Sequence, residues 1–177
     1  MSSEATGPLQ VDQPVAFGRN HKVDDFDSGV VELDDWLRRF GWVNHVSGNA
    51  RVFVAAREGA VVGYYTLSSA GVAKQQLPAE LTKGGVPTQV PCVLLGRLAV
   101  DRSAQGAHLG RSLLIDALIR VARLSDDLGV RALLIHARDE DARAWYTHQA
   151  RSFQPSPTDP LHLVLPIKEL RRIAGSA

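Results

Sequence analysis

The sequence has little cysteine and no long apolar run. Cys92 is the single cysteine among 177 residues, which excludes an internal disulfide framework and predicts a reducing, cytoplasmic setting. It follows Pro91 in an apolar context, so we interpret it as a core residue rather than a reactive thiol. No apolar stretch approaches the ~20 residues of a membrane-spanning helix. The first 14 residues also lack the charged-then-apolar pattern of a secretory signal.

A large excess of charge is missing as well, because the formal net charge is +1. The distribution is nevertheless uneven. Residues 1–35 carry eight acidic and two basic side chains, and residues 36–177 carry 18 basic and 11 acidic ones. A body with a net charge of +7 could meet a polyanion such as a nucleic acid. Ordinary mixing of charges on the folded surface is the alternative, and the sequence leaves both open.

The six histidines do not form a metal set. They show no pair at i, i+4 and no thiolate partner at the spacing of zinc sites, so no metal is expected. The sequence also suggests no ordered nucleophile, histidine and acid for hydrolytic chemistry. The six histidines are His21, His45, His108, His136, His148 and His162.

The length predicts one α/β domain. Residues 1–14 lack periodicity and are expected to form a disordered tail, with residues 15–177 forming the domain. Period-two and buried-type patterns predict strands, and apolar residues at helical spacing predict helices. The predicted strands are 15–17, 51–56, 61–68, 93–100, 130–137 and 161–165, and the predicted helices start near Ser28, Gly110, Glu140 and Ile167.

Two predicted segments carry specific expectations. The helix starting near Ser28 should bury an apolar face of Leu33, Trp36, Leu37, Phe40 and Val43. Residues 71–91 contain several glycines and prolines and are predicted to form a long loop with a short helix near residues 79–82. Because loops of this length in compact domains usually have a function, this loop could reach over the active end of the sheet.

The stretch from Leu94 to Leu124 organises the chain. It predicts a buried strand, a short polar loop and a helix whose apolar face includes Leu113, Leu114, Ala117, Leu118 and Val121. A strand, a helix and the next strand at 130–137 predict two parallel neighbours at the centre of a mixed sheet. A small-residue loop opening a helix directs unpaired N–H groups at one point, which suits phosphate, although simple turn geometry is the alternative.

The loop Gln105-Gly106-Ala107-His108-Leu109-Gly110 resembles the acyl-CoA loop of the GNAT acetyltransferase superfamily, Q/R-x-x-G-x-G/A. His108 stands where the family has its central glycine. The resemblance implies that this loop, with Arg111 and Ser112, holds the pyrophosphate of acetyl-CoA. It also implies that pantetheine pairs with the main chain of Leu98, Ala99 and Val100, as in strand addition.

A second block, from Asp139 to Tyr146, resembles the superfamily motif N-x-x-A-x-x-F/L-Y. Asp139 takes the place of the asparagine that contacts the pantetheine arm. Tyr146 matches the tyrosine that protonates the CoA thiolate as it leaves, and a positioned phenol can do so. A tyrosine that packs its ring in the core is the alternative for Tyr146.

Three further blocks, at residues 26–37, 94–101 and 153–163, resemble the TacT-type toxins of bacterial toxin–antitoxin pairs. The resemblance implies acetylation of the amino group of aminoacyl-tRNA, inhibition by a ribbon–helix–helix antitoxin, and a homodimer. The candidate tRNA-binding residues are Lys74, Lys83, Arg97, Arg138 and Arg143. Two alternatives stay open: acetylation of another amine, such as a protein N-terminus or a small metabolite, and a CoA-binding regulatory module without turnover.

Overall fold

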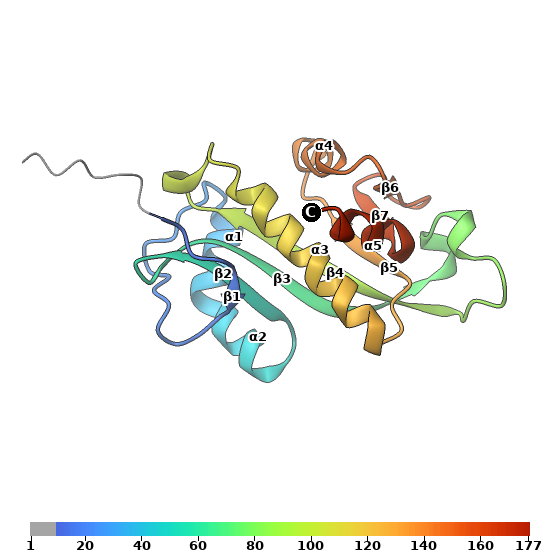
Figure 1. Ribbon diagram of the computed structural model, residues 1–177, viewed down its shortest axis with the longest axis horizontal. Coiled ribbons are helices and arrows are strands. Elements are labelled where there is room, and N and C mark those ends of the chain that lie inside the picture. Colours follow the sequence, from blue (N-terminus) through green and yellow to red (C-terminus); the bar gives the residue numbers. More distant parts are fainter. Residues whose placement is uncertain (1–9) are drawn as a thin grey trace, which may run out of the picture. The chain divides into compact units, whose positions relative to one another are not determined.

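A computed structural model describes residues 10–177. The described residues form a seven-stranded sheet in the order β1-β2-β3-β4-β5-β7-β6 (Figure 1). The sheet contains antiparallel and parallel pairs, which confirms the predicted α/β class with a mixed sheet. The described residues divide into two compact units, the first up to Tyr64 with Ala99–Leu113 and the second Tyr65–Leu98 with Leu114–Ala177. No helix among the described residues is long and apolar enough to cross a membrane.

The first unit combines a hairpin with a helical segment. β1 (Val15–Ala16) pairs antiparallel with β2 (Arg51–Arg57), and Glu58 and Gly59 turn the chain into β3 with φ angles of 51° and 82°. Two left-handed residues are typical of the tight turns that join twisted strands, so the predicted hairpin is present. Buried side chains from the strands and the helical segment form the core of this unit: Phe17, Phe26, Leu37, Val52, Val54, Val61, Tyr64 and Ala99.

The helical segment consists of α1 (Val31–Trp36), a π-helical turn η1 (Leu37–Gly41) and α2 (Trp42–Ser47). A π turn holds one more residue than an α turn, so it rotates everything after it. Leu37 and His45 are buried as a result, whereas Phe40 and Val43 are 52% and 60% exposed. The prediction that Phe40 and Val43 face the core is therefore wrong, and it is correct for Leu37.

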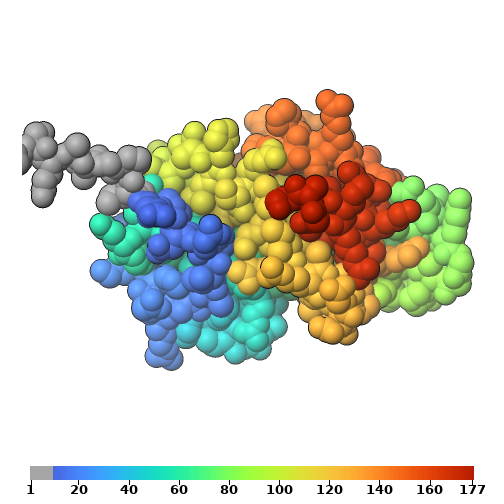
Figure 2. Space-filling model, in the orientation of Figure 1, coloured from blue at the N-terminus to red at the C-terminus, as the bar shows by residue number. Residues whose placement is uncertain are grey.

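The second unit is built on the predicted parallel pair. β4 (Gln89–Val100) and β5 (Ala132–His136) run parallel, with α3 (Leu109–Asp127) between them in the sequence. β7 (His162–Pro166) pairs antiparallel with β5, and the short β6 (Gln154–Pro155) pairs with β7. The helices α4 (Glu140–Gln149) and α5 (Ile167–Gly175) complete the unit. Figure 2 shows α5, in red, beside the end of α3, where Arg171 donates hydrogen bonds to Ser125.

The predicted face of α3 is correct. Leu113, Leu114, Ala117, Leu118 and Val121 are all at most 2% exposed. On the same helix the side chains of Asp116 and Arg120 pair at 2.8 Å, as their spacing predicts. Asp116 also accepts a hydrogen bond from the buried Tyr65 hydroxyl on β3 (Ala60–Ala73) at 2.5 Å, which ties the helix to the sheet.

The predicted long loop is shorter than expected. β3 continues to Ala73 and β4 begins at Gln89, so both strands extend into residues 71–91. Two 3₁₀ turns, η2 (Lys74–Gln76) and η3 (Ala79–Leu81), lie between them, and η3 confirms the short helix expected there. Leu77 and Leu81 pack with Cys92 of β4 in a buried cluster. The segment between β3 and β4 therefore covers part of the sheet with apolar side chains. Burial raises the pKa of the Cys92 thiol to about 11.

The expected disordered tail, residues 1–14, lies partly outside the described residues, which start at residue 10. Residues 10–14 have no regular secondary structure. Within this stretch the Asp12 amide donates a backbone hydrogen bond of 2.8 Å to the Ala56 carbonyl oxygen of β2.

Candidate active site

The loop between β4 and α3 has a backbone conformation that suits an anion. A 3₁₀ turn, η4 (Arg102–Ala104), follows β4, and α3 begins at Leu109. Gly106 has a φ of 83°, a left-handed conformation that favours glycine. The exposed loop residues 105–108 thus lead directly into the first turn of α3, whose leading N–H groups have no intrahelical partner. This arrangement suits the pyrophosphate that the sequence resemblance implies.

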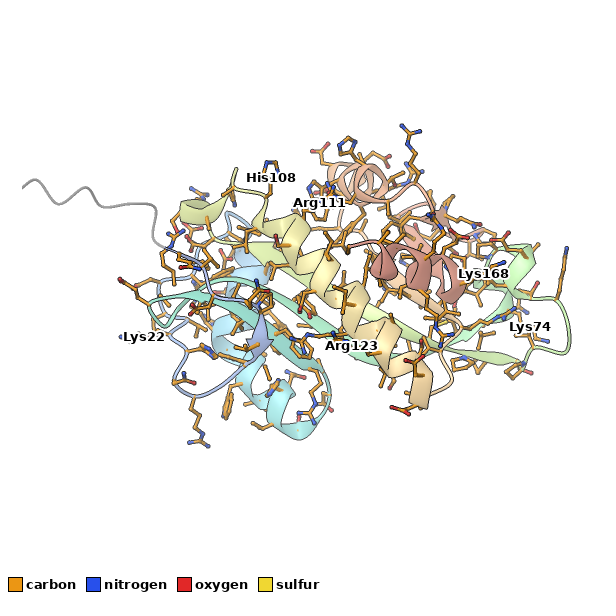
Figure 3. All side chains as sticks on the ribbon, in the orientation of Figure 1. Lys22, Lys74, His108, Arg111, Arg123 and Lys168 are labelled. Carbon is orange, nitrogen blue, oxygen red and sulfur yellow. The ribbon has the colours of Figure 1, made fainter. Side chains whose placement is uncertain are left out.

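His108 keeps the backbone conformation expected of a glycine. Its φ is 61°, in the left-handed region that non-glycine residues adopt at a cost of about 1–2 kcal/mol. The loop is therefore shaped by its main chain even though the central glycine is replaced. The His108 imidazole is exposed, and Figure 3 labels it together with Arg111 at the start of α3.

Gln105 acts as a brace for the loop. Its side-chain amide donates hydrogen bonds to the carbonyl oxygens of Ser28, at 3.0 Å, and Val100, at 2.9 Å. Asp101 strengthens the same corner, because its carboxylate accepts from the Ser103 amide and from the Asp27 amide, at 2.9 and 2.8 Å. These hydrogen bonds hold the pKa of Asp101 below its usual value in spite of partial burial.

The first turn of α3 presents Gly110, Arg111 and Ser112. Arg111 and Ser112 are exposed, and the Ser112 hydroxyl donates to the His108 carbonyl oxygen at 3.3 Å. Arg111 can add a charged contact to an anion on these N–H groups. Ala107 and Leu109 contribute through the backbone, since Ala107 is exposed and Leu109 starts the helix.

The pairing of β4 with β5 ends before β4 does. Their register runs from Cys92↔Ala132 to Leu95↔Ile135. β5 stops at His136, whereas β4 continues through Leu98 to Val100. The end of β4 therefore extends beyond its parallel partner. A strand edge of this kind is what an extended pantetheine chain requires for main-chain pairing.

Tyr146 lies on α4, which starts directly after β5. Its side chain is 8% exposed and meets the rings of Trp145 and Phe153 edge-on, with centroids 5.0 and 6.3 Å away. Burial raises the pKa of the Tyr146 phenol, so the group keeps its proton at neutral pH. A proton donor needs this protonation state.

Asp139 is the N-cap of α4. One of its carboxylate oxygens accepts from the Ala142 amide at 2.8 Å, and the other pairs with Arg138 at 3.0 Å. Both oxygens therefore have partners within the chain. If Asp139 also contacts pantetheine, as the resemblance implies, the same carboxylate has to serve both the ligand and the helix cap.

The candidate tRNA-binding residues come from separate segments of the second unit. Lys74 and Lys83 precede β4, whereas Arg138 and Arg143 follow the end of its parallel neighbour β5. The turn η2 that carries Lys74 also reaches the end of β5, because Gln76 lines the same pocket as His136. Arg143 is paired with Glu140 at 2.6 Å, and Arg97 lies on β4, half-buried.

The structure adds a pair of histidines that the sequence interpretation left aside. The imidazoles of His136 and His162 stack with centroids 3.8 Å apart and planes at 19°. They are direct partners in the register of β5 and β7. Both line a pocket of about 150 Å³ in the second unit, together with Leu94, Leu134, Ser156 and Val164. Sequence spacing could not reveal the pair, because 26 positions separate the two residues.

No group of three or more histidine, cysteine, aspartate or glutamate side chains in residues 10–177 could hold a metal ion. The stacked histidines have Asp159 as their acidic neighbour, at 3.5 Å from His162 Nε2.

Comparison with known proteins gives consistent results. The sequence profile described as "Acetyltransferase (GNAT) family" matches residues 15–153. A relative named "tRNA-acetylating toxin" from Mycobacterium tuberculosis (strain ATCC 25618 / H37Rv) is 47% identical over 153 residues, 86% of this chain and 90% of that protein.

Solved structures have the same fold. AtaT complexed with acetyl-methionyl-tRNAfMet superimposes with a TM-score of 0.83 at 26% identity, covering 93% of this chain and 99% of that one. A mutant AtaT toxin bound to acetyl-CoA and the C-terminus of the antitoxin AtaR gives 0.78 at 25% identity, covering 93% and 97%.

Proposed function

The chain belongs to the acetyltransferase (GNAT) family, and from that premise we propose that it acetylates the amino group of aminoacyl-tRNA and so blocks translation. The observation that carries this proposal is the 47% identity to a tRNA-acetylating toxin over nearly the whole of both chains. A fold shared with AtaT bound to acetylated methionyl-tRNA supports it.

In the candidate site, some residues would bind acetyl-CoA and Tyr146 would act as the proton donor. The backbone N–H groups of residues 106–111 and the Arg111 side chain would hold the pyrophosphate of acetyl-CoA, and the edge of β4 at Leu98–Val100 would hold its pantetheine arm. When bound, acetyl-CoA supplies an acetyl group as a thioester. Tyr146 would give a proton or hydrogen bond to the departing sulfur, and its buried, protonated phenol suits that role.

Transfer to charged tRNA can be tested directly. The purified protein is incubated with radiolabelled acetyl-CoA and total aminoacylated tRNA, and the labelled aminoacyl groups are released and identified. Label on the amino group of one or a few aminoacyl-tRNAs is expected. Label on free amino acids or protein N-termini, with none on charged tRNA, would contradict the proposal and favour an enzyme for another amine.

We further propose a cytoplasmic location and two protein contacts. The first is an antitoxin of the ribbon–helix–helix class. The complex of a structural relative with the antitoxin AtaR supports an antitoxin partner, and the class follows from the sequence resemblance. The second is a homodimer. Multi-angle light scattering of the isolated protein should give twice the mass of 19.2 kDa, and a monomer at all concentrations would refute the dimer.

A further inference from the structure

An acceptor amine must lose a proton before it can attack a thioester. An α-amino group has an ordinary pKa of about 7.7–8.0, so most of it is protonated and lacks a free lone pair at neutral pH. Acetyl transfer at this pH is faster with a group that accepts that proton. β4 and β5 carry no aspartate or glutamate, so a carboxylate base is absent from these two central strands.

We propose that His136 accepts the proton of the acceptor ammonium group and that His162 positions its ring. The assignment rests on the proposed acetylation of aminoacyl-tRNA. The pocket that both histidines line would then receive the aminoacyl end, with its amine at the imidazole.

The position of His136 at the end of β5 supports the assignment. His136 is the last residue of β5, one place beyond Ile135, where the pairing of β4 with β5 ends. The pantetheine arm is proposed for the adjoining edge of β4, so His136 borders the point where acceptor and thioester have to meet. Its side chain is only partly buried, and it lines the pocket of about 150 Å³ together with Leu94 and Leu134. Apolar walls and an exposed imidazole suit an aminoacyl group with a free amine.

The ring of His136 is also held in place. His162, its direct partner on β7, stacks on it at a centroid distance of 3.8 Å. His162 in turn lies 3.5 Å from the Asp159 carboxylate through Nε2. The His136 ring, stacked on His162 with Asp159 as the neighbour of His162, is held more firmly than the ring of an isolated surface histidine. Proton transfer requires such fixed geometry.

The charges around the pair favour a neutral His136. Partial burial lowers the pKa of His136, and the neighbouring His162 lowers it further, against a smaller opposite effect of Asp159. The other pocket residues that face it from β4 and η2, Leu94 and Gln76, carry no charge. His136 is therefore unprotonated at neutral pH and free to accept a proton, and its exposed ring can return that proton to solvent.

Two protons leave the acceptor nitrogen during the proposed transfer. One proton moves from the acceptor ammonium to His136, and the freed lone pair forms the C–N bond as the C–S bond breaks. The nitrogen loses a second proton on becoming an amide, and the sulfur gains one with the help of Tyr146. The sum is one acetylated amine, one CoA thiol and one proton released to solvent through His136.

The test compares His136→Gln with wild type, with His148→Gln on the exposed side of α4 as matched control. Acetylation of total charged tRNA is measured as kcat/KM between pH 6.5 and 8.5. His136→Gln should be about 100-fold slower at pH 6.5, and the deficit should shrink about tenfold by pH 8.5, because the amine is then already neutral. Calorimetry should show unchanged CoA affinity. Activity within twofold of wild type, or the same deficit at both pH values, would overturn the proposal.

Two measurements keep the proposal testable if His136→Gln misfolds. The NMR signal of the His136 ring in the wild-type protein should titrate below pH 6.5, and its pKa should rise in His162→Gln, which lacks the like-charged neighbour. In His136→Ala, added imidazole should restore part of the lost rate, which a purely structural residue would not allow. A His136 ring that is charged at pH 7 would refute the assignment. Wild-type protein that fails to acetylate charged tRNA at all would instead refute the proposed function.

Discussion

At the scale of a single residue, burial gives Tyr146 the protonation state that its proposed role as proton donor requires. Its phenol stays protonated because burial raises its pKa, and its ring is fixed by Trp145 and Phe153. Tyr146→Phe removes the hydroxyl and retains the ring. We expect turnover to fall about 100-fold while CoA affinity, measured by calorimetry, stays unchanged. Acetyl transfer at the wild-type rate would make Tyr146 a packing residue.

His108 offers a test of backbone strain. It is exposed and adopts a φ of 61°, so replacing it loses no packing but changes the cost of the left-handed conformation. His108→Gly should raise the free energy of unfolding by about 0.5–1 kcal/mol, and His108→Val should lower it by a similar amount or more. Urea denaturation measures both. Equal stability of the two variants would show that the loop relaxes around its side chain. CoA affinity should be retained in His108→Gly.

Single residues were predictable from the sequence where their role is local. The start of α4 near Glu140 was predicted correctly, because the Asp139 cap that begins this helix depends only on neighbouring residues. Gln105 could not be assigned as a brace, since its partner Ser28 is 77 positions away. The stack of His136 on His162 could not be predicted from the sequence either, because it depends on the register between β5 and β7.

At the scale of elements, α2 is locked to β2 by a buried imidazole. His45 accepts a hydrogen bond from the Val52 amide at Nδ1, at 3.0 Å, and burial together with Arg51 lowers the pKa of His45. The folded protein thus holds His45 neutral, whereas the unfolded chain takes up a proton as the pH falls below about 6.5. This contribution to stability is complete above pH 6.5 and is lost as the pH falls through the lower, folded pKa.

His45→Leu should therefore have two effects. The free energy of unfolding at pH 7.5 should fall by about 1–3 kcal/mol, because the buried Val52 amide loses its acceptor. Stability should also decline less between pH 7 and pH 5 than in wild type, as measured by denaturation at each pH. His148→Gln is the control and should follow the wild-type curve. A variant as pH-sensitive as wild type would show that His45 titrates alike in both states.

The first turn of α3 is the element on which the proposed anion site depends. Gly110→Asp adds bulk and a negative charge to this turn, so CoA affinity should fall at least tenfold in calorimetry while the fold is kept. Gly129→Asp is a matched control, because a Cβ there meets nothing within 4 Å and the residue lies beyond the end of α3. Unchanged affinity in a folded Gly110→Asp would remove the pyrophosphate from this turn.

Helix faces were predictable on α3 and only partly on the segment from α1 to α2. Regular spacing assigned the buried residues of α3 correctly because the helix is uninterrupted over 19 residues. The π turn at Leu37–Gly41 rotates the following residues, and no simple sequence pattern signals it. Phe40 and Val43 are exposed for that reason.

At the scale of the whole molecule, the mixed sheet with its central parallel pair followed from the sequence. Buried-type patterns mark β4 and β5, and a helix between two such strands favours a parallel crossover. The placement of β7 between β5 and β6 had no local signal, because it is decided by long-range pairing. The net charge of +7 on residues 36–177 was visible in the sequence, but the approach of the turn η2 to the pocket at His136 was not.

The net charge of +7 on residues 36–177 should make the reaction sensitive to salt if the substrate is a polyanion. A basic surface that holds the tRNA backbone releases counterions, so acetylation of charged tRNA at limiting concentration should fall about tenfold or more between 50 and 200 mM salt. Reversing both Lys83 and Arg143 to glutamate should weaken tRNA modification and flatten this dependence, without changing CoA affinity. Because Lys83 precedes β4 and Arg143 lies on α4, each single reversal identifies which segment contacts the tRNA. Lys168→Glu on α5 is the matched control and should behave as wild type. Acetylation that is insensitive to salt, or efficient acetylation of free amino acids, would favour a small amine as the substrate.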